Sequence, residues 1–343
     1  GSGRARDPTA HACAGGLGPV EQVRAFACAA EHSYRALELG EPSRVDRSLA
    51  TESITAAAQG NGALSERHAA AARLALARSG ERAKTLAIVP ASEALAFMMR
   101  GRWRDTLSAA ATAKAWIRRH TTGAWGELGF VEETELWGLA ATGDFVTLVA
   151  RQEAVAKRAI EQQDLYAGFG ARSGLSNLAY LASDLPDRAL AETERAVALW
   201  SKRGGHLQRM FDALARANVH LYARRPAEAA AVLAKLDAGM PRRLLVPEPV
   251  PALMADVRLR VALARALAGG PAPDRAERRL LRELTKGSRE WAAGLAALLE
   301  AGLAEVDGNS SLAARRAEEA AGLLLAADMV YLSKLASIYS RSQ

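Results

Sequence analysis

The stretch LAFMMRGRWRDTL (residues 95–107) joins an apolar segment to a polar, glycine-containing turn, and a second amphipathic segment follows. The same arrangement returns as LWGLAATGDFVTLV (136–149), LAYLASDLPDRAL (178–190) and NVHLYARRPAEAA (218–230). One position just past each turn is equivalent in all four segments, and it is occupied by Trp103, Phe145, Leu185 and Pro226. These residues follow one another in steps of 42, 40 and 41. Helical hairpins that return at a fixed period are typical of an α-solenoid, in which neighbouring hairpins bury each other's apolar faces.

The composition favours a chain without strands. Half of the 343 residues are apolar and only 5% are aromatic, and alanine, the best helix former, is abundant. No run of alternating β-branched residues is bounded by turn residues, as a strand would be. We therefore predict an all-α fold, an α-solenoid of stacked antiparallel hairpins similar to a tetratricopeptide (TPR) array, with about sixteen helices. The repeat is longer than the 34 residues of a standard tetratricopeptide unit.

The array is predicted to fill almost the whole chain. Residues 1–18 lack helical periodicity and are interpreted as a flexible stub, and residues 19–343 form the array, with a proline-rich interruption at 240–251. The first helix, 19–39, has apolar residues at helical spacing, namely Val23, Phe26, Ala27, Ala30, Tyr34 and Leu37. Further helices are expected at 43–59, 63–79, 81–100, 102–120, 125–142, 144–163, 165–183, 185–203, 205–223, 225–239, 252–268, 273–286, 289–306, 310–326 and 328–341. Pro90 predicts a kink or a break in its helix.

Charge and cysteine content limit the classes of partner. The net charge is +7 and the isoelectric point about 9.7, but acidic residues are scattered among the basic ones, which favours solvated helix faces over a nucleic-acid patch. Two cysteines, Cys13 and Cys28, form no disulfide framework and favour a cytoplasmic setting. The sequence contains no apolar stretch that is long and uncharged enough to predict a membrane span. The start GSGRARDP lacks an initiator Met, so we expect a fragment of a longer protein.

The motifs of catalytic and metal sites are absent from the sequence. No histidine pair has HExxH spacing, and no Walker loop or kinase signature is present. Ser173-Gly174 is interpreted as the interior of a helical repeat, not as the strand–turn–helix of a nucleophile elbow. The acidic group Glu127, Glu132, Glu133 and Glu135 is expected to be a solvated or ion-paired helix face, because these positions splay around a helix. We predict no enzyme activity, no metal and no cofactor.

Six tryptophans stand out in an aromatic-poor chain. One interpretation is that they fill gaps between packed hairpins. The other is that one or two act as binding anchors on a concave surface, because Trp and Arg are favoured at interfaces. The candidate partner-binding residues are Trp116 with Arg118 and Arg119, and Trp200 with Lys202 and Arg203.

The segment DLYAGFGARSGLSNLAYLASDLPDRALAETERAVALWSKRGGHLQRMFDALARANVHLY (164–222) resembles the C-terminal tails of large bacterial multidomain serine/threonine kinases. LELGEPSRVDRSLA (37–50), FMMRGRWRDTL (97–107) and residues 295–337 are similar to the same tails, and the resemblance keeps its order over residues 17–340. In that family a kinase domain and an ATPase-like module precede a tetratricopeptide-like tail. The resemblance implies a signalling protein of a GC-rich bacterium, and this chain contains none of the family's kinase motifs.

These observations favour an interaction or regulatory module that binds a protein partner, or kinase and ATPase-like modules of its own polypeptide, along a concave groove. The alternative is a small-ligand sensor of an ATPase-linked regulator, which would need a pocket with a few convergent polar groups. Binding to nucleic acid or to a membrane is not expected.

Overall fold

The computed structural model describes residues 22–79, 83–120, 125–200, 207–240, 246–286 and 290–342. Within these ranges the chain is helical and contains no strand, which confirms the predicted all-α class. The helices are α2 (Gln22–Leu39), α3 (Pro42–Ala58), α4 (Gly62–Ser79), α5 (Ala83–Met99), α6 (Trp103–His120), α7 (Trp125–Thr142), α8 (Phe145–Glu161), α9 (Leu165–Gly170), the 3-10 turn η1 (Gly174–Asn177), α10 (Leu178–Ala182), α11 (Pro186–Ala198), α12 (Leu207–Tyr222), α13 (Pro226–Gly239), α14 (Val250–Leu267), α15 (Arg275–Arg278), α16 (Leu280–Leu284), α17 (Glu290–Val306), α18 (Ser310–Ala326) and α19 (Val330–Ser342).

The four repeated turns share one backbone geometry. In each, an amide just past the helix donates back to a carbonyl five residues earlier, from Arg102 to Phe97, Asp144 to Leu139, Leu185 to Tyr180 and Arg225 to His220. The residue before each donor has a positive φ, and these residues are Gly101, Gly143, Asp184 and Arg224. This bond with a left-handed residue is the Schellman ending of a helix, which satisfies carbonyls that the helix itself leaves without donors. The period seen in the sequence is therefore a period of helix ends.

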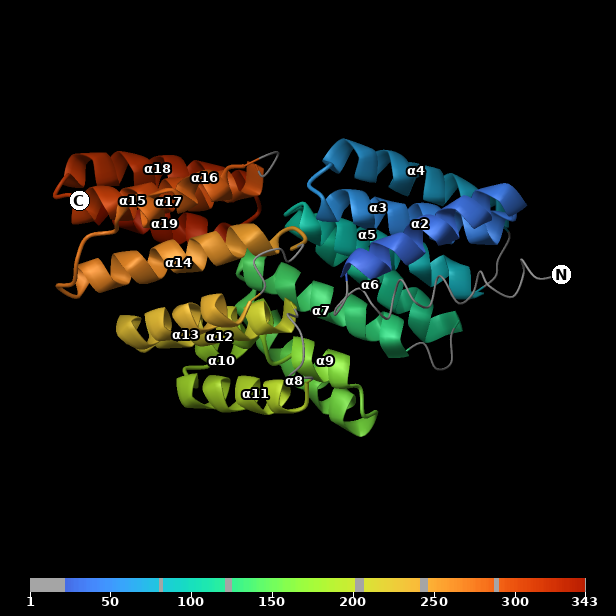
Figure 1. Ribbon diagram of the computed structural model, residues 1–343, viewed down its shortest axis with the longest axis horizontal. Coiled ribbons are helices and arrows are strands. Elements are labelled where there is room, and N and C mark those ends of the chain that lie inside the picture. The colour runs from blue at the N-terminus through green and yellow to red at the C-terminus, as the bar shows by residue number, and fades with distance from the viewer. Residues whose placement is uncertain are drawn as a thin grey trace.

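The array bends so that its last hairpins return to its first turns. Figure 1 shows α2 to α6 on the right, α8 to α13 along the lower edge and α14 to α19 on the left. The ring of Trp291, at the start of α17, lies edge-on to Trp103 with centroids 5.5 Å apart. The rings of Tyr331 and Phe145 meet in the same way at 4.9 Å. These contacts join residues almost 190 positions apart, so one apolar core runs from the middle of the array to its C-terminal helices.

The repeated turns look equivalent in the sequence, but the C-terminal helices α17 and α19 pack on only some of them. A Cβ atom added at Gly101 would lie 2.2 Å from the Trp291 ring, and one at Gly143 would lie 2.2 Å from Tyr331 Cβ. Real Cβ atoms do not approach other atoms so closely, so both positions need glycine for space as well as for backbone conformation. The next turn has Asp184 at the left-handed position, and the adjacent Leu185 is 40% exposed.

One predicted helix, 165–183, is wrong as a continuous element. The chain forms α9, the turn η1 and α10 instead, with extended backbone at Ser173 and a positive φ at Gly174. The indole of Trp137 enters this break, because a Cβ on Gly174 would lie 2.9 Å from its ring. Buried amides bind the freed carbonyls: Gln152 donates to Ala171 at 2.9 Å, and Asn177 donates to Arg172 at 2.9 Å. The break therefore admits a large side chain without leaving those carbonyls unpaired.

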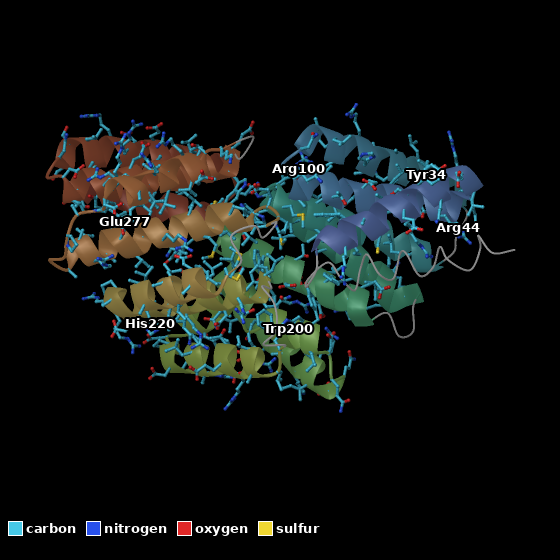
Figure 2. The ribbon with its side chains drawn as sticks, in the orientation of Figure 1. Tyr34, Arg44, Arg100, Trp200, His220 and Glu277 are labelled. Atoms are coloured by element: carbon cyan, nitrogen blue, oxygen red, sulfur yellow. The ribbon has the colours of Figure 1, made fainter. Side chains whose placement is uncertain are left out.

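Three smaller expectations also need correction. A kink or a break was expected at Pro90; helix α5 continues through this buried proline, so the break does not occur and the kink stays a prediction. The predicted helix 273–286 is divided into α15 and α16. The first helix exposes part of its apolar stripe, since Tyr34 and Leu37 are 65% and 63% exposed, and Tyr34 lies on α2 in Figure 2. The face that this helix buries consists of three alanines and a histidine, namely Ala25, Ala29, His32 and Ala36.

The ends of α13 and α14 flank the segment for which the proline-rich interruption is predicted. Helix α13 ends at Gly239 and α14 begins at Val250, with Pro251 in its first turn, where proline is tolerated. The amide of Glu248 donates to the carbonyl of Ala58 at 3.1 Å, so the connector is tied to the end of α3. The predicted flexible stub at residues 1–18 lies outside the described residues.

Candidate functional site

The first predicted binding group lies at the C-terminal end of α6. Trp116 is half-buried and packs against the apolar cluster formed by α5, α6 and α7, whereas Arg118 and Arg119 are exposed. The indole therefore contributes to packing between helices, as the first interpretation of the tryptophans predicts. The two guanidinium groups remain accessible for a partner.

The second predicted group follows α11. Trp200 is half-buried, and its ring centroid lies 5.4 Å from that of Phe169. Lys202 and Arg203 lie outside the described residues. Helices α6 and α11 occupy different parts of the array in Figure 1, and Trp200 is found among the lower helices in Figure 2. Trp116 and Trp200 therefore pack against different neighbours, Trp116 in the cluster of α5, α6 and α7 and Trp200 against Phe169 of α9.

Two of the acidic side chains of α7, Glu132 and Glu135, are ion-paired across helices, and ion pairing was one of the two expectations for this group. Glu132 accepts from Arg158 of α8 at 2.6 Å. Glu135 binds Lys114 of α6, and its other oxygen lies 3.1 Å from the Arg151 guanidinium. Both carboxylates are largely buried, so these pairs fix the relative position of α6, α7 and α8.

Glu133 differs from its neighbours because its partner is neutral. Its Oε2 atom accepts from the hydroxyl of Tyr166 at 2.5 Å. Burial raises the pKa of Glu133 to about 7, since it penalises the charged carboxylate, and the Tyr166 hydrogen bond opposes that rise. Burial also raises the pKa of the Tyr166 hydroxyl. The carboxyl is wedged against Gly170, where an added Cβ would lie 2.9 Å from its carbon. Glu133 is therefore held between the Tyr166 hydroxyl and the backbone of Gly170.

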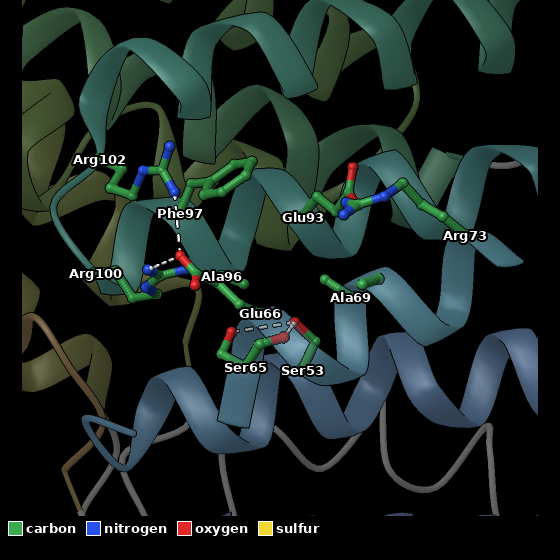
Figure 3. Close-up of a pocket in the computed structure, with 11 residues that line it drawn as sticks. Ser53, Ser65, Glu66, Ala69, Arg73, Glu93, Ala96, Phe97, Arg100 and Arg102 are labelled. Carbon is green, nitrogen blue, oxygen red and sulfur yellow. Dashed lines mark hydrogen bonds and ion pairs between the residues drawn. The ribbon is translucent and has the colours of Figure 1, made fainter. Parts of the chain in front are cut away.

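A pocket with a volume of about 300 Å³ opens between α3, α4, α5 and the turn before α6. Figure 3 shows its lining, with Arg100 and Arg102 beside Glu66 on one side and Arg73 beside Glu93 on the other. The lining residues are Ser53, Ser65, Glu66, Ala69, Ala70, Arg73, Glu93, Ala96, Phe97, Arg100 and Arg102. A volume of this size lies at the lower end of the range for small-molecule sites.

The charges of this pocket are held by mutual pairing. The Glu66 carboxylate accepts from Arg100 at 2.6 Å and lies 3.4 Å from Arg102. The hydrogen bond from Arg100 lowers the pKa of Glu66. Arg102 also binds Asp105 at 2.6 Å, and its guanidinium carbon lies 4.9 Å from the centre of the Phe97 ring. Arg73 pairs with Glu93.

Sequence reasoning did not identify this pocket. The available signal was the Arg100-Gly101-Arg102 triplet, which places two guanidinium groups on either side of the first repeated turn. The opposing residues Glu66 and Arg73 are about thirty positions earlier, and only the packing of α4 on α5 brings them to the turn.

Comparisons with known proteins add no identification, since no family model, no curated protein and no solved structure matches this chain. In the part of the chain that the structure describes, no three His, Cys, Asp or Glu side chains are grouped as metal ligands. Over the same ranges, each helix is too short or too polar to cross a lipid bilayer.

Proposed function

We propose that this chain is a non-catalytic interaction and regulatory module of a bacterial signalling protein, cytoplasmic and derived from the tail of a serine/threonine kinase. It binds a protein partner or its own upstream kinase and ATPase-like modules. The observation that carries the proposal is the repeated hairpin, with one turn geometry returning along the array. Arrays of this kind present extended surfaces, and binding to other proteins is their common use.

The use of charged side chains supports the same proposal. The acidic residues of α7 are engaged by Arg158, Lys114 and Tyr166 in contacts between helices. Such contacts stiffen the array and hold its curvature, which suits a scaffold whose surface shape is recognised. Arg118 and Arg119, two of the predicted partner-binding residues, are exposed at the end of α6.

Crosslinking tests this proposal. The chain is mixed with the kinase and ATPase-like modules encoded by the same gene, and crosslinks are mapped by mass spectrometry. We expect crosslinks on the surface around α6, and we expect the charge reversals Arg118→Glu and Arg119→Glu together to reduce them. The matched control reverses Arg279 and Arg282, two exposed arginines of the α15–α16 segment, and should leave the crosslinks unchanged. Equal crosslinking in both double variants, or none in the wild type, would contradict the proposal.

A second candidate function is a small-ligand sensor of an ATPase-linked regulator. The observation that favours it is the arginine-lined pocket between α3, α4, α5 and the first repeated turn. A pocket that joins apolar lining to a few convergent polar groups is the usual form of a small-molecule site.

A further inference from the structure

The pocket beside the first repeated turn combines two kinds of surface. Its apolar part, which we call the apolar floor, consists of the methyl groups of Ala69, Ala70 and Ala96 and the ring of Phe97, and the buried Ser53 and Ser65 line the pocket beside it. Its rim holds guanidinium groups, and Arg100 and Arg102 come from one turn while Arg73 comes from α4. Figure 3 shows Arg100 and Arg102 on the same side, with the Glu66 carboxylate between them.

The two arginines of the turn are positioned before any ligand binds. Arg102 stacks at 4.9 Å over Phe97 and is bonded to Asp105, so its orientation is fixed on two sides. The Arg100 side chain is only 18% exposed. A guanidinium that is already oriented loses less conformational entropy when it binds a carboxylate or a phosphate, and it offers two parallel donors.

Glu66 occupies the place where an external anion would sit. Its side chain is 55% exposed and its carboxylate is held by Arg100 and Arg102. Exposed ion pairs contribute little stability because water and salt screen them. A ligand anion can therefore displace Glu66 at small cost, while the rest of the ligand covers the apolar floor.

We propose that this pocket binds a small organic anion, a carboxylate or phosphate attached to a compact apolar body, with Arg100 and Arg102 as the anion donors and Glu66 as an internal competitor. This inference deepens the small-ligand alternative given above and rests on it. The titration below uses the chain alone, without a protein partner. A negative titration would therefore count against this inference only, and a negative crosslinking experiment would count against the protein-interaction function only.

The test uses phenyl phosphate as the probe in isothermal titration calorimetry at low ionic strength. We expect a dissociation constant on the order of 1 mM, since the probe is small. Inorganic phosphate lacks the apolar body and phenol lacks the charge, so each should bind at least about ten times more weakly. Phenol binding as tightly as phenyl phosphate would overturn the role of the anion, and equal binding of inorganic phosphate would overturn the role of the apolar floor.

Two substitutions with opposite signs make the test specific. Arg100→Gln should weaken phenyl phosphate binding at least about tenfold, whereas Glu66→Gln should tighten it several-fold because it removes the competitor. The controls are Arg282→Gln and Glu318→Gln, which alter exposed side chains on α16 and α18. Circular dichroism confirms the folding of each variant. No heat in the wild type and in Glu66→Gln, or the same affinity in all variants, would overturn the proposal.

Discussion

Replacing Gly101 by alanine should open the contact between the first repeated turn and the C-terminal hairpins. Gly101 has φ of +69°, and a Cβ there would lie 2.2 Å from two atoms of the Trp291 ring. Trp291 has little room to move, because it is 4% exposed and lies edge-on to the fully buried Trp103. The added methyl group therefore has to displace a packed indole.

The structure supplies a control that separates backbone strain from packing. Gly308 has φ of +76°, and a Cβ there would meet nothing within 4 Å. Gly308→Ala therefore costs only the left-handed backbone strain, roughly 1–2 kcal/mol. Gly101→Ala adds an overpacking cost of roughly 1–3 kcal/mol, which brings its total to roughly 2–5 kcal/mol. The difference between the two variants measures the contact that closes the array.

Urea denaturation followed by far-ultraviolet circular dichroism and by tryptophan fluorescence gives both free energies of unfolding. We expect Gly101→Ala to be less stable than Gly308→Ala by at least about 1 kcal/mol. We also expect the fluorescence of the folded Gly101→Ala variant to differ from that of the wild type, since Trp103 and Trp291 separate. Equal losses of stability with unchanged fluorescence would refute the packing of Trp291 on this turn.

Three further predictions address the core and its pH dependence. A double-mutant cycle of Trp103→Ala and Trp291→Ala should give a coupling energy of about 0.5–1.5 kcal/mol in urea denaturation, and strict additivity would contradict their contact. Trp137→Ala should cost about 3–5 kcal/mol, because the indole is buried in the break at Gly174, and a loss below 1 kcal/mol would contradict this placement. Because burial raises the pKa of Glu133 to about 7, its neutral form stabilises the fold fully below about pH 4.5. That stability is lost as the pH rises through 7, by roughly 3 kcal/mol. Glu133→Gln should flatten the dependence between these pH values, and an unchanged slope in urea denaturation would contradict the burial of Glu133.

The positions of most helices could be predicted because their ends are encoded locally. Pro42, Pro186 and Pro226 each stand in the first turn of a helix, where the fixed φ of proline suits the backbone. Asp144 caps α8 by accepting from the Thr147 amide, and Asn309 caps α18 in the same way. These signals act over a few residues, so they can be read without knowledge of the tertiary fold.

The break between α9 and α10 could not be predicted by the same means. The segment has helical periodicity, and its interruption depends on Trp137, which lies more than thirty residues earlier. The sequence also could not identify which cationic residues pair with the carboxylates of α7, although ion pairing was one expectation. Spacing on one helix shows which carboxylates share a face, but Arg158 and Lys114 come from other helices.

The candidate site residues were also predicted from the sequence only in part. The sequence identified Trp116 and Trp200 as unusual residues, and the structure places both indoles against neighbouring side chains. The pocket at Arg100 and Arg102 emerged only when Glu66 and Phe97 were brought beside them. A pocket is a property of several chain segments at once, and no single segment contains its shape.

The sequence alone determined the helical class, the repeated turns and the period near 40 residues, because propensity, capping and left-handed turn residues act locally. Tertiary structure alone decided that the array returns on itself. Gly101 and Asp184 hold equivalent positions in the repeat, but only Gly101 is covered, by Trp291 from the far end of the chain. Such a contact depends on the sum of many small bends between hairpins, and no local pattern records that sum.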